Sequence, residues 1–581
     1  MTLAGLNRML ALLMSSLLLI APSAPASGRT DTSLVEWGSR ATGRPLLALQ
    51  PSVSLAVSHS TDPQAQVITA SKDDPSATRL TRPTQPNIYT GDSQPDAPTS
   101  LLAVVSQAPR LRQAPISSAA QLNAAVRALA GKFQLKGKAA FEPDWPAPDS
   151  ATALLGRELF FSKALSGDQD VACVSCHHPL LAGGDGLSLA VGVAALEPAR
   201  LGLGRRYDLA SGGKRDPHAI PGPNVPRNSL TIINAGLYQK NFFFDGRLQR
   251  MGAIGMRTPE SLRDNGRDLM AVQARFPVAA EDEMRGYRLL RYQAPDQVRD
   301  VLVERLQVNW QGAFAKAFGD ATPSAKSVSY QRVEHALSDY QRSFVLLDNP
   351  WFAFLAGDTD VINASAKRGA LLFYADSHGG GLDCVSCHRG DLFSDEQFHV
   401  LAIPQIGRGV KRPAAGYGNA TERNGSDFGR WEVTRRKSDR HAFRTTNLLN
   451  VEMTAPYGHN GAYISLEAVI QHHLDPAAAI EVFDFGLSSL PQFHDSEAHY
   501  PAALSLTKTA LASFTATKHQ PTQARITDMQ MHDLVSFLHA LTDPCIQSKA
   551  CLSEWLPDPH TRAPDGQRLR PLLPPLTAAT D

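Results

Sequence analysis

The chain has 581 residues, 43% of them hydrophobic, which is ordinary for a globular protein and long enough for two or three domains. Lysine and arginine together number 57 against 56 aspartates and glutamates. This balance indicates neither a nucleic-acid-binding protein nor one that binds an anionic membrane surface, so partners are inferred from local motifs.

The first 26 residues have the pattern of a secretory signal peptide. Arg8 precedes an apolar run from Met9 to Ile20, and Ala24 and Ala26 are spaced for cleavage. A dozen or so apolar residues are fewer than the ~20 that a membrane-spanning helix needs. No other segment is long and apolar enough to span, so we expect an exported, periplasmic protein without a membrane span.

Residues 27–140 are rich in Ser, Thr, Pro, Gln and Asp and lack hydrophobic periodicity. This composition predicts a low-complexity extension that is disordered or acts as a tether. From Phe141 onward the sequence suggests short helices separated by long Gly- and Pro-containing loops, with little strand-like alternation. The fold is therefore expected to be mainly α.

One coarse internal repeat is present. The stretches LGRELFFSKALSGDQDVACVSCH and RGALLFYADSHGGGLDCVSCH share the order helix, loop, Cys-x-x-Cys-His motif. Two copies predict two similar domains, residues 141–345 and 346–560, followed by a tail over 561–581. A last helix is expected from about Asp528 to Leu541, beginning with a Thr-x-x-Gln capping box.

Four of the six cysteines lie in the two motifs. The other two, Cys545 and Cys551, are close in sequence just after the last predicted helix. In an oxidising compartment, a disulfide between them is expected rather than two free thiols.

The two Cys-x-x-Cys-His motifs carry the strongest chemical signal. In such a motif the thiols add to the vinyl groups of a haem, and the adjacent histidine binds the iron. A zinc site or a thioredoxin-like redox pair would leave the histidine after each second cysteine unexplained. We therefore expect two cytochrome c-like domains that bind two c-type haems covalently. The attachment residues are Cys173, Cys176 and His177 for the first haem and Cys384, Cys387 and His388 for the second.

With these motifs, the sequence resembles the bacterial dihaem cytochrome c peroxidase family, which includes the MauG-like protein-oxidising enzymes. The resemblance runs from about Leu155 to Pro544. It rests on LGRELFFSKALSGD, PRNSLTIINAGLYQKNFFFDGR, QARFPVAAEDEMRG and TAPYGHNGAYISLEAVIQHH. It implies that the N-terminal haem reacts with peroxide, while the C-terminal haem takes up electrons and stores oxidising equivalents.

The segment QARFPVAAEDEMRG implies the peroxide pocket. By resemblance, Gln273 and Glu283 lie above the first haem, where Gln273 orients peroxide and Glu283 moves a proton between the two peroxide oxygens. Pro277 lies between them and breaks a helix. The two side chains are therefore expected to reach the pocket from different backbone segments.

The sixth position of the first iron is expected to be open. Family peroxidases that need reductive activation carry a distal histidine after a Ser-x-Gly-type segment, and here the corresponding stretch LSLAVGVAAL has Val193 near that place. An open iron can bind peroxide, as in the MauG-like branch. His218, in the long insertion after Val193, is the histidine that could reach this iron in another state. His178 lies about 100° around a helical turn from His177, so a surface or hydrogen-bonding role is expected for it.

The second iron is expected to be closed by a histidine from SLEAVIQHH. Ser465 can cap a helix whose apolar face also presents His473, whereas His472 is rotated by about 100°. Family members place methionine or tyrosine near this position, and histidine would lower the reduction potential relative to methionine. We expect His473 as the ligand and His472 as the alternative, the other option being that both are exposed helix-end residues.

Two further expectations concern the region between the haems. The resemblance implies a calcium ion bound by the Asn228 side chain and the carbonyls of Thr454 and Pro456, all oxygen donors as a hard cation requires. His459, nearby, is expected to support the region by hydrogen bonding. Family members usually have tryptophan where this chain has Phe244, so electron transfer between the haems is expected to be slower or to use another group.

Together these expectations describe a dihaem cytochrome c peroxidase-like oxidoreductase that reduces hydrogen peroxide with electrons from a small cytochrome c or a cupredoxin. One alternative is MauG-like oxidation of residues in a partner protein, favoured by the missing distal histidine and opposed by Phe244. Another is a non-catalytic dihaem electron carrier. Dioxygen chemistry on polyisoprene, as in the larger rubber oxygenases, fits Glu283 less well. A homodimer is one option for the oligomeric state.

Overall fold

The computed structural model describes residues 118–574, except 142–143, 208–222, 253–254, 261–267, 289, 291–292, 411–424, 495–499 and 518–523. The predicted signal peptide, the extension up to residue 117 and His218 lie outside the described residues. By internal contacts Thr81–Asp581 form one unit, which contains everything described below. In the described ranges, no helix combines the length and apolar character needed to cross a membrane.

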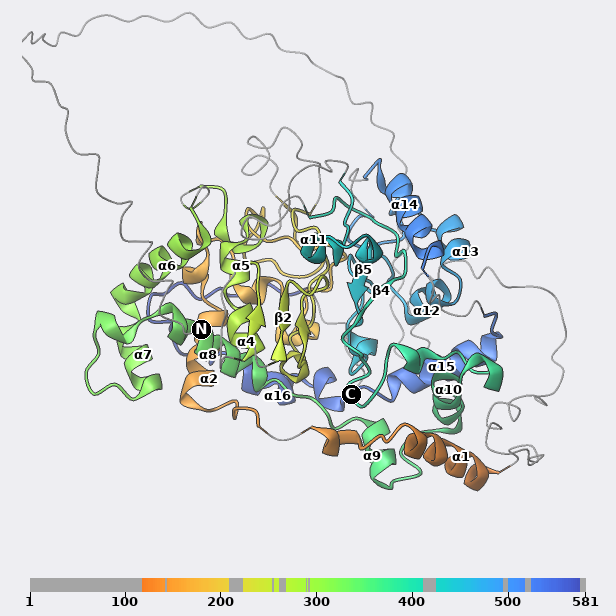
Figure 1. Cartoon of the computed structure of the whole chain (residues 1–581). Coiled ribbons are helices and arrows are strands. Elements are labelled where there is room, and N and C mark those ends of the chain that lie inside the picture. Colours follow the sequence, from red (N-terminus) through yellow and green to blue (C-terminus); the bar gives the residue numbers. More distant parts are fainter. Residues whose placement is uncertain are drawn as a thin grey trace, which may run out of the picture. The chain divides into compact units, whose positions relative to one another are not determined.

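The described chain is mainly helical, as the sequence predicts (Figure 1). The helices before residue 345 are α1 (Ala119–Lys132), α2 (Ala151–Phe160), α4 (Leu269–Gln273), α5 (Phe276–Ala279), α6 (Pro295–Asn309), α7 (Gln311–Phe318) and α8 (Tyr330–Arg342). Those after it are α9 (Pro350–Ala356), α10 (Ala364–Tyr374), α11 (Trp431–Thr434), α12 (Leu466–Leu474), α13 (Pro476–Glu481), α14 (Ala503–Thr515), α15 (Asp528–His539) and α16 (Lys549–Leu552). Thr527 and Gln530 form the capping box of α15, which confirms that prediction.

The strands of the described residues form two small antiparallel sheets, and short 3-10 helices lie between the longer elements. The first contains β1 (Asn241–Phe242), β2 (Leu248–Arg250) and β3 (Met256–Arg257), in that order. The second pairs β4 (Phe398–Val400) with β5 (Ala442–Arg444). In this pair His399 lies opposite Phe443, and Phe398 lies opposite Arg444. Because cross-strand partners share a face, His399 and Phe443 point to one side and Arg444 to the other.

The buried side chains form two main hydrophobic cores. The first includes Leu159 of α2, Leu302 of α6 and Leu346. The second begins with the next residue, Leu347, and includes Phe537 of α15. The boundary between the two cores therefore lies near residue 345, where the repeat in the sequence divides the chain.

Both ends of the described chain depart from the simple sequence division. Residues 118–140 were expected to belong to the disordered extension, but α1 is a helix with a Ser118 capping box that packs into the second core. Beyond the predicted boundary at 560, Ala563 and Leu569 pack into the first core, together with Trp555. Each end thus crosses to the core formed by the other half of the sequence, so the segment 561–574 is not a free tail.

The two halves repeat one helix-packing arrangement. In each, the helix before the haem motif packs on a later helix, α2 on α8 and α10 on α15. A Cβ atom on Gly156 of α2 would lie 1.9 Å from the carbonyl oxygen of Ala336, and one on Gly369 of α10 would lie 1.9 Å from that of Asp533. Both crossings are closer than any side chain allows, and in the sequence both α2 and α10 are followed by a Cys-x-x-Cys-His motif.

This close crossing leads to a stability prediction. The substitution Gly156→Ala is expected to lower the free energy of unfolding by about 2–4 kcal/mol, because α2 must move away from α8 to admit the methyl group. Gly312→Ala in α7 is the matched control, since a Cβ there meets nothing within 4 Å. That control is expected to be neutral or to add up to about 1 kcal/mol. Denaturant midpoints of the two variants measure the difference, and equal midpoints would contradict the packing argument.

Candidate functional site

Both Cys-x-x-Cys-His motifs face one cavity of about 1760 Å³. This is larger than the roughly 300–1,000 Å³ of an ordinary ligand pocket. The cavity wall includes all six motif residues: Cys173, Cys176, His177, Cys384, Cys387 and His388. The four cysteines are free thiols, as attachment to vinyl groups requires. The volume and the donor set therefore fit two covalently bound haems.

The motif histidines have the protonation state of metal ligands. His388 donates its Nδ1–H to the carbonyl oxygen of Phe393, at 3.0 Å, which leaves the Nε2 lone pair for iron. Burial, followed by the nearby His473, lowers the pKa of His388 to about 4. Burial also lowers the pKa of His177. Both rings are thus neutral near pH 7, the form that binds a metal.

His178, which follows the first motif, is part of the core rather than the surface. Its side chain is only 1% exposed and contacts the Phe161 ring edge to face. Its Nδ1 accepts a hydrogen bond from the N–H of Leu180, at 3.1 Å. The expected hydrogen-bonding role is confirmed, and the expected surface position is wrong.

Gln273 and Glu283 both line the cavity wall. Gln273 ends α4, whereas Glu283 lies in a π-helical turn over Glu281–Arg285. The short helix α5 separates them, with Pro277 in its first turn. The prediction that they reach the pocket from different backbone segments is confirmed.

The turn that carries Glu283 is held by backbone contacts on both sides. The N–H of Gly167 donates to the carbonyl oxygen of Met284, at 2.8 Å, and that of Val193 donates to the carbonyl oxygen of Asp282, at 3.2 Å. Val193 is fully buried and is not part of the cavity wall. The position where some relatives are expected to carry a distal histidine therefore supports the Glu283 turn instead.

Glu283 lies in an environment that favours its protonated form. Burial raises the pKa of its carboxyl group, and the charge of Asp282 adds to the effect, whereas Arg247 opposes it. Arg247 is itself held by Asp245, with Nε donating to the carboxylate at 3.1 Å, and lies over the Phe243 ring. A carboxyl group with a raised pKa suits the transfer of a proton in both directions.

The helix α12 presents His473 to the cavity. Ser465 caps α12 by accepting a hydrogen bond from the N–H of Ala468, as the sequence predicts. His473 lines the cavity and donates its Nδ1–H to the carbonyl oxygen of Val469, at 2.7 Å. The Nε2 lone pair therefore remains free on a side chain that faces the same cavity as His388.

His472 is not suited to the same role. It is fully buried, with Nδ1 accepting from the hydroxyl of Tyr463 at 2.8 Å and Nε2–H donating to the carbonyl oxygen of Leu401 at 2.7 Å. Burial lowers its pKa to about 3. Both ring nitrogens are used within the protein, so the alternative ligand His472 is wrong for this arrangement, as is the option of two exposed helix-end histidines.

The residues expected at a calcium site lie in one part of the wall. Asn228, Thr454 and Pro456 all line the cavity. The side-chain amide of Asn228 donates to the carbonyl oxygen of Leu187, at 2.8 Å, which leaves its oxygen as the free donor atom. The backbone N–H of Asn228 donates to the carbonyl oxygen of His459, at 3.0 Å, in line with the support expected from that residue. Calcium itself stays a prediction.

The region around Phe244 contains groups that the sequence did not reveal. Phe244 meets the ring of His459 edge to face at 6.4 Å, and His459 stacks on Phe443 at 3.7 Å between centroids. Arg227 is buried beside them and binds both Asp245 and Asp427, each at 2.7 Å. The partners Arg227 and Asp427 are 200 residues apart, so no local pattern predicts this buried ion triad.

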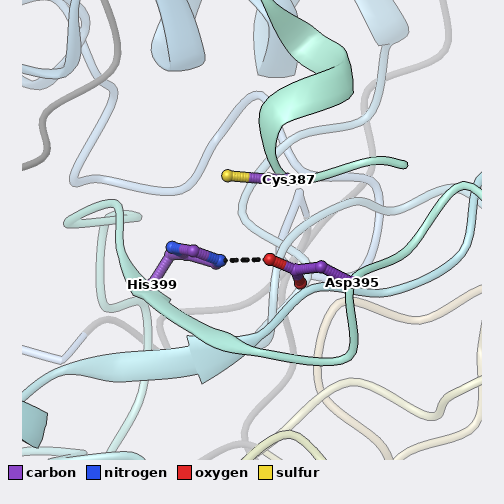
Figure 2. Close-up of side chains that lie close together, drawn as sticks. All are labelled: Cys387, Asp395 and His399. Atoms are coloured by element: carbon purple, nitrogen blue, oxygen red, sulfur yellow. Dashed lines mark hydrogen bonds and ion pairs between the residues drawn. The ribbon is translucent and has the colours of Figure 1, made fainter. Parts of the chain in front are cut away.

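A further cluster lies beside the second motif (Figure 2). One potential ligand atom each from Cys387, Asp395 and His399 lies within 4.8 Å of the other two. His399 donates its Nε2–H to Asp395, at 2.9 Å. Three such donors could hold zinc, but the Cys387 thiol belongs to the haem-attachment motif. We therefore assign Asp395 and His399 to the surroundings of the second haem.

Comparisons with known proteins agree with this site. Residues 150–360 match the family model of the di-haem cytochrome c peroxidases. The chain is 28% identical over 367 residues to the methylamine utilization protein MauG of Methylorubrum extorquens, covering 61% of this chain and 79% of that protein. It is also 28% identical over 347 residues to the cytochrome-c peroxidase IdrP1 of Pseudomonas sp. (strain SCT), covering 56% and 73%.

Among solved structures, a MauG-like protein associated with microbial copper homeostasis matches with a TM-score of 0.45 and 21% identity, over 71% of this chain and 95% of that one. The sequence relatives include both MauG proteins and cytochrome c peroxidases. Together with the family model over residues 150–360 and the two haem motifs, they support a relationship of this chain to the dihaem cytochrome c peroxidase and MauG-like family.

Proposed function

We propose that the protein is a periplasmic enzyme that reduces hydrogen peroxide at the N-terminal haem with electrons passed through the C-terminal haem. The coarser assignment, a dihaem c-type oxidoreductase, follows from the family. The observation that carries the finer one is that Gln273 and Glu283 line the same cavity as His177. The signal-like N-terminus supports export.

The two haem domains are proposed to be cytochrome c-like. The two cysteines of each motif would hold a haem by thioether bonds, and His177 and His388 would bind the irons. When bound, the haems supply a site for peroxide and a path for single electrons. The protein side chains then have to orient the peroxide, move its protons and keep the second iron closed.

Gln273 and Glu283 are proposed as the catalytic residues. The Gln273 amide can both donate and accept hydrogen bonds, so it can orient a bound peroxide. Glu283 accepts the proton of the inner peroxide oxygen as a carboxylate and returns it to the outer oxygen, which leaves as water. Two electrons and two further protons complete the reduction of one hydrogen peroxide to two waters.

His473 is proposed as a residue that, together with His388, would hold the C-terminal iron. The hydrogen bond from its Nδ1–H to Val469 fixes the tautomer that frees Nε2 for the metal. With His388 and His473 both bound to it, this haem would supply electron transfer and would leave no position for peroxide. A calcium ion held by Asn228, Thr454 and Pro456 between the haems remains part of the proposal.

The electron donor is proposed to be a small cytochrome c or a cupredoxin. MauG-like oxidation of a partner protein is the second candidate, favoured by the absence of histidine at Val193 and by the MauG relatives. The two candidate functions differ in the source of the electrons that reduce the oxidised haems. A peroxidase takes them from a soluble donor, and a MauG-like enzyme takes them from residues of its protein substrate.

Steady-state turnover tests the proposed function. The two-haem protein, mixed with a reduced monohaem cytochrome c or a reduced cupredoxin and hydrogen peroxide, is expected to oxidise the donor continuously and without prior reductive activation. The same mixture without peroxide is the control. Failure to oxidise either class of donor, with both haems attached, would contradict the peroxidase assignment.

A further inference from the structure

Arg444 is a buried cation in the cavity wall. It is the last residue of β5, is 4% exposed and lines the cavity that both haem motifs share. Among the residues that the structure describes, no carboxylate forms an ion pair with it. A buried charge is costly unless an opposite charge and hydrogen bonds compensate it.

The guanidinium group is held in place but only partly satisfied. Its Nε–H donates to the carbonyl oxygen of Phe243, at 3.1 Å, and its central carbon lies 3.9 Å from the centroid of the Tyr238 ring. The backbone N–H of Arg444 donates to the carbonyl oxygen of Phe244, at 2.8 Å. The Nη1 atom is buried and has no hydrogen-bond partner. The side chain is thus fixed in place and keeps the two N–H donors of Nη1 unused.

Other buried arginines of the protein show how a buried guanidinium group is compensated. Arg227, which lines the same cavity, binds the carboxylates of Asp245 and Asp427, while Arg275 and Arg299 bind glutamates at 2.6 Å and 2.8 Å. Arg205 and Arg430 are also buried and form no ion pair among the described residues, but their guanidinium groups donate to carbonyl oxygens, and that of Arg430 also to the side-chain oxygen of Gln249. Within the described residues, the Nη1 atom of Arg444 has no acceptor of either kind. Arg444 faces the cavity that fits two haems, and each haem carries two carboxylate groups.

We propose that Arg444 binds a haem propionate through its free Nη1. The inference rests on the proposed function only in requiring two bound haems. The backbone contacts with Phe243 and Phe244 place this propionate beside the segment expected to lie between the haems. Pairing the propionate with a fixed guanidinium makes reduction of that iron easier, because the added cation favours the less positive reduced state. Arg444 is therefore a positioning residue that raises the reduction potential of one haem.

The test uses R444Q and R444K in the two-haem protein, with the reduction potential of each haem measured by spectroelectrochemical titration. R444Q is expected to lower the potential of one haem, with about a tenfold change in its reduction equilibrium, which is 59 mV for one electron. R444K keeps the charge and is expected to retain most of the potential. The haem whose potential changes is the one whose propionate Arg444 binds.

Arg257→Gln is the matched control, because it removes the same charge from an exposed arginine that donates to the carbonyl oxygen of Val433. It is expected to leave both potentials near those of the wild type. If R444Q leaves the potentials of both haems at their wild-type values while its melting point falls, Arg444 has a merely structural role and the proposal is overturned.

Resonance Raman spectra keep the proposal testable if R444Q fails to retain both haems. In R444K the propionate bending band of one haem is expected to shift, because an ammonium group does not reproduce the planar fork of arginine. Unchanged bands for both haems would contradict the proposal and would point to a free anion at Nη1. Neither readout requires peroxide turnover, so an inactive protein with an Arg444-dependent potential would refute the proposed function and leave this inference intact.

Discussion

Replacing Glu283 with glutamine is expected to lower kcat/KM for hydrogen peroxide by about 10²–10⁴-fold, the usual contribution of a positioned general acid–base. Glutamine keeps the size of the side chain but cannot take up and return a proton. The rate of peroxide-dependent oxidation of a reduced donor, measured by stopped flow, reports the loss. Glu281→Gln is the matched control, since Glu281 lies in the same turn but is not part of the cavity wall.

The pH dependence gives this prediction a second readout. The carboxylate form of Glu283 accepts the first proton, and burial raises its pKa above the ordinary value. The kcat/KM of the wild type should therefore fall as the pH falls through this raised pKa. The E283Q variant should lack that acidic limb. A variant with wild-type kcat/KM and the same pH profile would show that Glu283 is not the proton carrier.

Replacing His473 with glycine is expected to convert the second haem from a low-spin to a high-spin state, with loss of essentially all of the low-spin signal of that haem. The reason is that Nε2 of His473 is the proposed sixth ligand, and glycine leaves no donor in its place. Electron paramagnetic resonance and the visible spectrum measure the change. Turnover with a reduced donor should fall with it, because the electron path then passes through an altered iron.

His472→Gln is the control on the same helix. It disturbs the hydrogen bonds to Tyr463 and Leu401 and is expected to cost about 1–3 kcal/mol of stability. The low-spin signal should nevertheless persist. If H472Q abolishes the low-spin signal and H473G preserves it, the assignment of the ligand is wrong.

The parts of the site that the sequence predicts are those with local or repeated patterns. The haem motifs have fixed spacing, the α15 capping box lies within four residues, and the disulfide between Cys545 and Cys551 is present as expected. Gln273 and Glu283 were reached by resemblance to family motifs, and the structure brings both to one wall. The choice between His472 and His473 needed the hydrogen-bond partners of each ring, which helical spacing alone does not provide.

The features that sequence reasoning missed depend on contacts between distant segments. The ion triad of Arg227 joins residues about 200 positions apart, and Leu569 returns to a core built mainly before residue 346. The composition of residues 27–140 concealed α1, whose apolar side chains are buried only because the second core covers them. Arg444 has no sequence signal, since the partner proposed for it is a haem propionate and not another residue.

The spectrum of the resting, fully oxidised protein tests the central claim most directly. Electron paramagnetic resonance should show one high-spin haem with an open position and one low-spin haem with two histidine ligands, and hydrogen peroxide should change the high-spin signal. Two low-spin haems that do not respond to peroxide would contradict the account and would indicate a dihaem electron carrier.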